Sequence, residues 1–569
     1  MIDIVQKMRD ESLLDDQSAE RVNAHLAQGM PLDEALLSHS GLSEEQTLRF
    51  LAGEFQIPYI DMEECRPSRE FLSQFPARIL LEQKVLPLEG NHGSLRVAVG
   101  SLFDTSGLDQ LRLATGKEFQ MVLAPATEID RCIKRYLGVG ADTVQSMVSE
   151  ARESGMEIIH DDIENDIDLT NTAAGASIIQ FVNQVLTEAI ELRATDVHFE
   201  PFENELRVRY RIDGVLQEAT IPSEVKRFQT AIISRLKILS HLDIAEKRLP
   251  QDGRIKIRIK DHQIDVRVSV IPMLHGEAVV LRLLDQSAML LGLEQLGMSL
   301  QDRQTFEHIL ALPHGIILVT GPTGSGKTTS LYAALSQIND IDRKIITIED
   351  PIEYQLSGIN QIQVSLKAGM TFARGLRSIL RHDPDIILIG EIRDMETAEI
   401  AVQASLTGHL VFSTLHTNDA PGALTRLMDM GIEPYLVASS LEAVIAQRLV
   451  RLICPDCRQE SEPKEIRQLH NEFGNNLPEK LYRGQGCRRC QGTGYLGRRG
   501  IFEQMIVTEK IRSLILEGSS AGKIRQKAMQ EGMRSLREDA CRYLQQGQTT
   551  IAEVMRITKD SLPSEIEKK

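Results

Sequence analysis

The segment Gly321-Pro-Thr-Gly-Ser-Gly-Lys-Thr328 matches the pattern G-x-x-x-x-G-K-[ST] at every fixed position. An apolar run at 316–320 precedes it and a helical pattern at 329–338 follows, which is the context that a phosphate-binding loop requires. The glycines let backbone N–H groups turn toward phosphate oxygens, and the helix N-terminus adds the positive end of a dipole. The alternative is a glycine-rich turn that matches the pattern by chance.

This loop predicts a role for particular side chains. Lys327 should reach the β- and γ-phosphates of a nucleotide, and the Thr328 hydroxyl should bind Mg²⁺. The residues expected to contact the nucleotide are Gly321, Pro322, Thr323, Gly324, Ser325, Gly326, Lys327, Thr328 and Thr329.

Acidic residues follow two other apolar runs. The run 386–389 ends in Gly390-Glu391, and the run 345–348 ends in Glu349-Asp350. The carboxyl ends of parallel strands meet at one edge of a sheet, where such sheets bind ligands. Glu391 is therefore a candidate to position Mg²⁺ or an attacking water, and Glu349 is a less specific one. The alternative for Glu391 is a carboxylate that only caps the next helix.

Four of the seven cysteines form two Cys-x-x-Cys pairs, Cys454/Cys457 and Cys487/Cys490, with 29 residues between the pairs. Two such turns can bring four thiolates to a tetrahedron, which is the geometry of structural Zn²⁺. The pattern therefore predicts a zinc site with no open position for catalysis. Free thiols and an iron–sulfur cluster remain alternatives.

Composition limits the class of protein. A chain of 569 residues is too long for a single hydrophobic core. Its composition, with 42% apolar and 25% charged residues, is typical of a soluble globular protein. A net charge of −17 argues against a nucleic-acid binder. The N-terminus has no secretory signal pattern, and no apolar run is long enough for a membrane span. We expect a cytoplasmic protein whose membrane role, if any, comes through a partner.

The elements that position these residues follow from the hydrophobic pattern. Near-continuous apolar strands alternating with helices predict a parallel sheet covered on both faces, in an α/β protein. Strict alternation at 206–212, 255–259 and 266–270 predicts a sheet packed on helices. The expected parts are an N-terminal domain (1–140), an acidic linker (141–172), a second domain (173–284), a core of strands and helices (285–452), a cysteine insert (453–492) and a helical C-terminal region (493–569).

The sequence resembles the secretion traffic ATPases of type II secretion and type IV pilus assembly. Four blocks carry the resemblance in the family's order: the phosphate loop, the Asp box Ile348–Glu353, the atypical Walker B block Ile389–Asp394 and the His box Thr407–His416. The resemblance covers about residues 175–560 strongly. It implies a RecA-like P-loop core, a preceding PAS-like α+β domain, a four-cysteine zinc insert and an N-terminal α/β domain.

The resemblance also implies roles for single residues. Glu391 matches the Walker B glutamate, with Gly390 where an aspartate usually stands, and Glu349 matches an acidic Asp-box position. His416 matches the histidine thought to sense the γ-phosphate, and His409 matches the same box less surely. A satisfied core imidazole is the alternative for either histidine.

Two arginines of the second domain, Arg267 and Arg282, resemble the family's arginine fingers. A guanidinium suits the charge that develops on a transferred phosphoryl group. The alternative for Arg267 is a solvated strand face on which it pairs with Asp265.

Family resemblance further implies a homo-hexamer that uses ATP, Mg²⁺ and Zn²⁺. Its N-terminal domain would dock on an inner-membrane secretion or pilus platform protein, which would hold the ATPase peripherally at that membrane. The segment Leu242–Gly253 looks closer to the type II secretion branch than to pilus assembly. A pilus assembly ATPase, a nucleotide-dependent scaffold and a DNA-translocating ATPase are the alternatives. The Arg-Leu-Gly motif through which some relatives bind a cyclic dinucleotide is not found.

Overall fold

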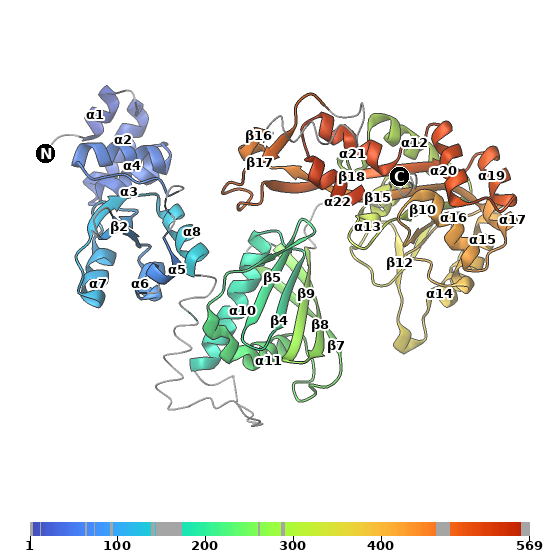
Figure 1. Cartoon of the computed structure of the whole chain (residues 1–569), viewed down its shortest axis with the longest axis horizontal. Coiled ribbons are helices and arrows are strands. Elements are labelled where there is room, and N and C mark those ends of the chain that lie inside the picture. Colours follow the sequence, from blue (N-terminus) through green and yellow to red (C-terminus); the bar gives the residue numbers. More distant parts are fainter. Residues whose placement is uncertain are drawn as a thin grey trace, which may run out of the picture. The chain divides into compact units, whose positions relative to one another are not determined.

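A computed structural model describes residues 4–11, 13–62, 65, 67–72, 74–90, 95–137, 143, 173–259, 262–285, 291–461 and 478–558 (Figure 1). The chain divides into two units, Met1–Asp285 and Gln286–Lys569. The predicted acidic linker at 141–172 lies outside the described residues except for Thr143. No helix among the residues that the structure describes is long and apolar enough to cross a membrane.

The N-terminus is helical, as the pattern of the first 50 residues predicts. The helices are α1 (Ile4–Asp10), α2 (Asp16–Ala27), α3 (Leu32–His39) and α4 (Glu44–Phe55). Two of them begin at side-chain caps: Asp15 accepts a hydrogen bond from the Ser18 amide, and Ser43 forms a reciprocal capping box with Gln46. Their apolar faces share a small core that includes Met8.

A three-stranded sheet follows, with strand order β1-β2-β3. The elements are α5 (Arg69–Leu72), α6 (Ala77–Glu82), β1 (Leu86–Glu89), β2 (Leu95–Val99), α7 (Ser106–Thr115), β3 (Gln120–Leu123) and α8 (Ala126–Leu137). The buried carboxylate of Asp33 in α3 accepts hydrogen bonds from the Ser101 hydroxyl and the Leu102 amide. This contact fixes the helical segment to the loop after β2.

The second sheet of the first unit has six antiparallel strands, in the order β6-β5-β4-β9-β8-β7. Alternate strand residues such as Val197, Phe199 and Val208 pack against the helices, which explains the predicted alternation. The elements are α10 (Ala173–Glu191), β4 (Asp196–Pro201), β5 (Leu206–Ile212), β6 (Val215–Glu218), α11 (Gln229–Leu239), β7 (Gln251–Ile259), β8 (His262–Met273) and β9 (Gly276–Asp285).

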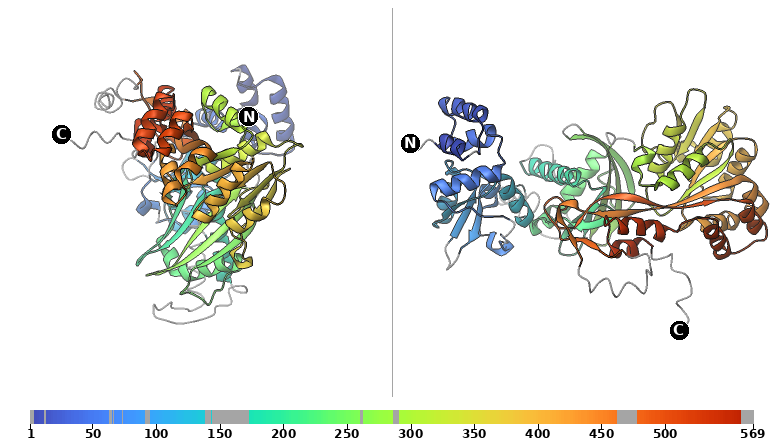
Figure 2. Two further views of the ribbon diagram at one scale, coloured as in Figure 1. Left: turned by 90° about the vertical axis from the view of Figure 1, so that its right-hand side faces the viewer. Right: turned by 90° about the horizontal axis from the view of Figure 1, so that it is seen from above.

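The second unit is built on a seven-stranded sheet, in the order β12-β11-β13-β14-β10-β15-β18. Residues of β10 alternate between two cores, since Ile316 and Leu318 enter one and Ile317 and Val319 the other. Both faces are therefore covered, as the continuous apolar runs predict, and Figure 2 shows helices on both sides of this sheet.

The strands of this sheet and their helices, up to Cys454, are α12 (Leu300–Leu310), β10 (Gly315–Thr320), α13 (Lys327–Ile338), β11 (Ile345–Glu349), β12 (Asn360–Gln363), α14 (Phe372–Ile379), β13 (Ile386–Ile389), α15 (Met395–Leu406), β14 (Leu410–Leu415), α16 (Ala420–Asp429), α17 (Pro434–Ser440) and β15 (Leu441–Ile453). In the order of the sheet, the six strands β12, β11, β13, β14, β10 and β15 are parallel to their neighbours.

The region from residue 493, expected to be helical, differs from that expectation at its start. It opens with β18 (Tyr495–Ile506), which pairs antiparallel with β15 and forms the edge of the sheet. The pairing joins residues far apart in the chain, so local periodicity does not reveal it. Helices α19 (Glu509–Leu516), α20 (Ala521–Gln530), α21 (Leu536–Gln545) and α22 (Ile551–Thr558) follow, as expected.

Candidate nucleotide-binding site

The predicted phosphate loop joins the end of β10 to the start of α13. Gly321 and Gly326 have φ angles of +143° and +87°, in the region that favours glycine. A Cβ on Gly321 would lie 2.4 Å from the backbone oxygen of Gln447, and one on Gly326 would lie 2.9 Å from the Gln447 side-chain nitrogen. Both glycines are therefore favoured by conformation, and Gly321 is also required by space because its neighbour is a backbone atom. The loop and the N-terminus of α13 form a cradle that fits phosphate.

Lys327 occupies the inside of this loop. Its Nζ donates hydrogen bonds to the carbonyl oxygens of Gly321, at 2.8 Å, and Pro322, at 3.1 Å. Burial lowers the pKa of Lys327, and the nearby Glu391 carboxylate opposes that shift. A partly desolvated ammonium held by neutral carbonyls would gain from charged phosphate oxygens, because charge-assisted hydrogen bonds are the stronger ones.

Glu391 and His416 follow the carboxyl ends of the neighbouring parallel strands β13 and β14. The Nε2 atom of His416 lies 3.2 Å from Oε2 of Glu391, and Arg393 forms an ion pair with the other carboxylate oxygen. The Ile392 amide donates to the Thr414 carbonyl at 3.1 Å, which extends the pairing of the two strands past their ends. The Glu391 side chain is only 13% exposed, so its carboxylate is held in one place.

Gly390 explains why this block has no aspartate before the glutamate. A Cβ at this position would lie 3.2 Å from the Cα of Glu349 on the adjacent strand end. The Gly390 amide also donates to the Ile348 carbonyl at 2.8 Å. The ends of β11 and β13 approach so closely that a side chain here would push them apart, which favours glycine at this position and leaves Glu391 as the carboxylate of the block.

Glu349 ends β11 with a buried side chain that has its own partners. Its carboxylate accepts hydrogen bonds from Tyr332 at 2.5 Å, Thr347 at 2.6 Å and Gln361 at 3.2 Å. Burial raises the pKa of Tyr332, and the carboxylate raises it further. The structure thus ties Glu349 to α13 and β12, and its hydrogen bonds among the described residues do not reach Lys327 or Glu391.

His409 lies at the other end of β14 from His416. Its Nδ1 is 2.9 Å from the Ala404 carbonyl oxygen and 3.2 Å from the Thr407 hydroxyl, at the end of α15. This histidine closes the turn into the strand and is separate from the Glu391–His416 pair.

Arg267 and Arg282 are direct cross-strand neighbours on β8 and β9. Arg282 donates through Nε to the Asp196 carboxylate at 3.1 Å. On the adjacent strand β7, Arg254 forms an ion pair with Asp265. Both predicted arginine fingers belong to the first unit, and their role toward a nucleotide in the second unit stays a prediction.

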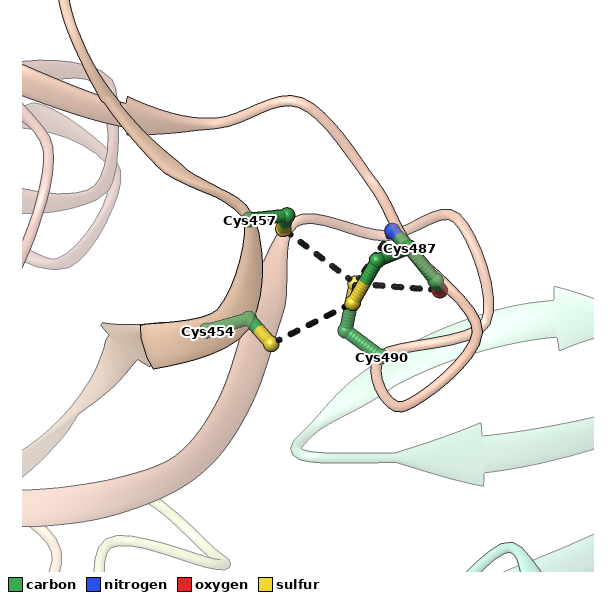
Figure 3. Close-up of side chains that lie close together, drawn as sticks. All are labelled: Cys454, Cys457, Cys487 and Cys490. Atoms are coloured by element: carbon green, nitrogen blue, oxygen red, sulfur yellow. Dashed lines mark hydrogen bonds between the residues drawn. The ribbon is translucent and has the colours of Figure 1, made fainter. Parts of the chain in front are cut away.

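Four cysteines gather where β15 ends and β18 begins (Figure 3). The sulfur of Cys454 lies 3.6 Å from that of Cys487, and the sulfur of Cys490 lies 3.7 Å from those of Cys457 and Cys487. All four sulfurs lie within 4.8 Å of one another. Zn–S bonds of about 2.3 Å give a tetrahedron whose edges are about 3.8 Å, so the cluster fits a zinc ion.

Three residues of the second unit contact the site but were not predicted from the sequence. Arg393 lies two positions after Glu391, a spacing that could have suggested the ion pair. Tyr332 and Gln447 carry no comparable signal, because their contacts with Glu349 and the phosphate loop depend on packing between distant segments.

A phosphate loop between a parallel strand and a helix, with a carboxylate and a histidine at the next strand ends, defines a P-loop nucleotide hydrolase core. A family model described as "Type II/IV secretion system protein" matches residues 171–556, and one described as "MshEN domain" matches residues 55–142. The chain belongs to the family of type II secretion and type IV pilus ATPases.

Individual relatives agree with this assignment. The type II secretion system protein E of Xanthomonas campestris is 44% identical, over 93% of each chain. The type IV pilus assembly ATPase PilB of Myxococcus xanthus is 42% identical, also over 93% of each chain. The X-ray structure of the ATPase DotB of Yersinia pseudotuberculosis shares the fold, with a TM-score of 0.50 and 20% identity over 71% of this chain and 98% of that one.

Proposed function

We propose that this secretion ATPase is a hexameric motor that powers type II protein secretion. The observation that carries the proposal is the Glu391 carboxylate, which lies 3.2 Å from His416 and opposes the lowering of the Lys327 pKa that burial in the phosphate loop causes. A scaffold that bound nucleotide only for assembly would not need a largely shielded carboxylate beside the loop. The RecA-like and PAS-like assignments and the domain boundaries given above form part of this proposal.

The reaction would proceed by in-line attack of water on the γ-phosphorus. The loop residues 321–329, with the Lys327 side chain, would hold the phosphates. The Thr328 hydroxyl would hold Mg²⁺, which neutralises phosphate charge when bound. Glu391 would orient the water and accept its proton, while the bond from the γ-phosphorus to the bridging oxygen breaks to give ADP and phosphate. His416 would report the γ-phosphate. Arg267 and Arg282 would stabilise the developing charge, and Glu349 would support the site.

The four-cysteine cluster would hold a structural Zn²⁺. Cys454 and Cys490 are buried, and four thiolates leave no open position for a substrate. The metal would fix the ends of β15 and β18, which pair along their whole length from the sheet to the cluster.

The N-terminal part of the chain would dock on an inner-membrane platform protein and hold the motor peripherally at the cytoplasmic side. The 42% identity to a pilus assembly ATPase makes type IV pilus assembly a second candidate. A pull-down from bacterial membranes with the full chain decides between them. A type II secretion platform protein in the captured fraction supports the first function, and a pilus platform protein supports the second.

Turnover of ATP by the full-length protein tests the enzymatic part. Phosphate release should be measurable with the wild type and should fall to background in Lys327→Ala, which removes the cation at the phosphates. Equal release by the two proteins would exclude this site as the place of hydrolysis. Binding of a fluorescent ATP analogue should fall in parallel.

A further inference from the structure

Gln447 of β15 lies directly beneath the phosphate loop. Ala446 is the register partner of Thr320, the last residue of β10, so Gln447 comes next to Gly321. Its backbone oxygen and its side-chain nitrogen abut Gly321 and Gly326, at 2.4 Å and 2.9 Å from the Cβ positions of the two glycines. A single residue thus contacts both glycines that frame the loop.

The Gln447 side chain is a buried amide whose oxygen lacks a partner. Gln447 is only 2% exposed, and its Oε1 atom has no hydrogen-bond partner among the residues that the structure describes. The hydroxyl oxygens of Thr320 and Ser325, at the start of the loop and within it, are also buried without a partner in the described part of the chain. A buried polar atom without a partner lowers stability, and an apolar side chain of similar volume would avoid that loss. Packing alone therefore does not account for an amide at this position.

We propose that Gln447 is a positioning residue of the phosphate loop. It supports Gly321 and Gly326 from below and so fixes the path of the backbone whose amides receive the phosphates. The side chain does not touch the nucleotide itself. This proposal rests on the proposed ATPase function, because it assigns a support to that same site.

The positioning role predicts opposite effects on binding and on stability. Gln447→Met keeps the length of the side chain and removes the amide. We expect its KM for ATP and its Kd for a fluorescent ATP analogue to rise at least fivefold, with kcat within twofold of the wild type. The melting temperature should stay the same or rise, because the unpartnered oxygen is gone. Gln447→Glu should weaken nucleotide binding further, because it adds a negative charge beneath the phosphates.

Gln504 offers a matched control in the neighbouring strand. Gln504 belongs to β18 and lies opposite Ile445 of β15, and its buried Oε1 also has no hydrogen-bond partner among the described residues. None of its atoms is among those nearest to the Cβ positions of the loop glycines. Gln504→Met should leave KM and Kd unchanged. Wild-type affinity in Gln447→Met, or an equal loss in both methionine variants, would overturn the positioning role. Failure of the wild type itself to release phosphate would refute the proposed function instead, while the binding measurement would still test the loop.

Discussion

The imidazole of His416 and the carboxylate of Glu391 lie 3.2 Å apart although 25 residues separate them in the chain. The strands before them are parallel neighbours, with Ile389 opposite Ser413. The other carboxylate oxygen contacts Arg393, so two basic side chains hold Glu391. In the proposed hydrolysis, the attacking water would share the Glu391 carboxylate with these two partners, because a carboxylate has about four lone-pair sites for hydrogen bonds.

Glu391→Gln should abolish turnover without abolishing binding. The amide is nearly isosteric but cannot accept the proton of the attacking water, so we expect kcat to fall by about 10²- to 10⁴-fold. The Kd for a fluorescent ATP analogue should change less than threefold. Phosphate release and fluorescence titration measure the two quantities. Phosphate release equal to an active wild type would show that another group accepts the proton, and background release by both proteins would favour a scaffold whose nucleotide serves assembly alone.

His416→Ala tests whether the histidine acts through Glu391. We expect kcat to fall roughly tenfold or more, because the carboxylate loses one of the two contacts that orient it. In a double-mutant cycle, His416→Ala should add little to the loss already caused by Glu391→Gln, since coupled residues are not additive. Fully additive losses would show that the two side chains act independently.

The parallel core is the part of the fold that local sequence predicts best. The strand at Ile386–Ile389 is predicted with its observed bounds, because both of its faces are buried and its apolar run is continuous. The pairing of β15 with β18 was missed, since it depends on residues such as Ala443 and Ile506 that are distant in the sequence. Local pattern identifies a buried strand more readily than it identifies the partner of that strand.

The site shows the same division. The strand ends of a parallel sheet predict Glu391 at the ligand-binding edge, and the family resemblance adds His416; the structure places these two side chains 3.2 Å apart. The orientation of Glu349 could not be predicted in this way. Its side chain turns toward Tyr332 on α13, and that choice depends on how the helix packs against β11.

Gly390→Ala should damage the site through the backbone. The new Cβ would lie 3.2 Å from the Cα of Glu349, so one of the two strand ends must move. We expect a loss of stability of about 1–3 kcal/mol and a fall in kcat of roughly 10- to 100-fold, because the displacement carries Glu391 with it. Gly522→Ala is the control, since its nearest neighbouring atom would be 4.0 Å away. Equal stability and turnover in both variants would contradict this account of Gly390.

Metal analysis of the purified protein should find about one zinc per chain, since four thiolates define one tetrahedral site. Cys487→Ser should lose the metal and lower the melting temperature, because the ends of β15 and β18 lose their fixed point. Cys541→Ser, which changes a buried cysteine outside the cluster, should retain it. Iron with sulfide in the wild-type protein would replace the zinc assignment by an iron–sulfur cluster.

The buried Glu553 should make the stability of the second unit depend on acid pH. Burial alone would raise its pKa, but ion pairs with Arg556 at 2.6 Å and Arg451 at 2.8 Å lower it below the ordinary value. A depressed pKa in the folded state means that this stabilisation is complete above the unfolded pKa of about 4.3 and is lost as the pH falls below it.

Glu553→Gln should lower the free energy of unfolding at pH 7 by about 3 kcal/mol, because it leaves two arginines beside an uncharged group. It should also flatten the loss of stability as the pH falls below about 4.3, the unfolded pKa, because the wild-type carboxylate takes up its proton there as the protein unfolds. Urea unfolding at several pH values measures both effects. A variant that retained the acid dependence of the wild type would place the responsible carboxylate elsewhere in the chain.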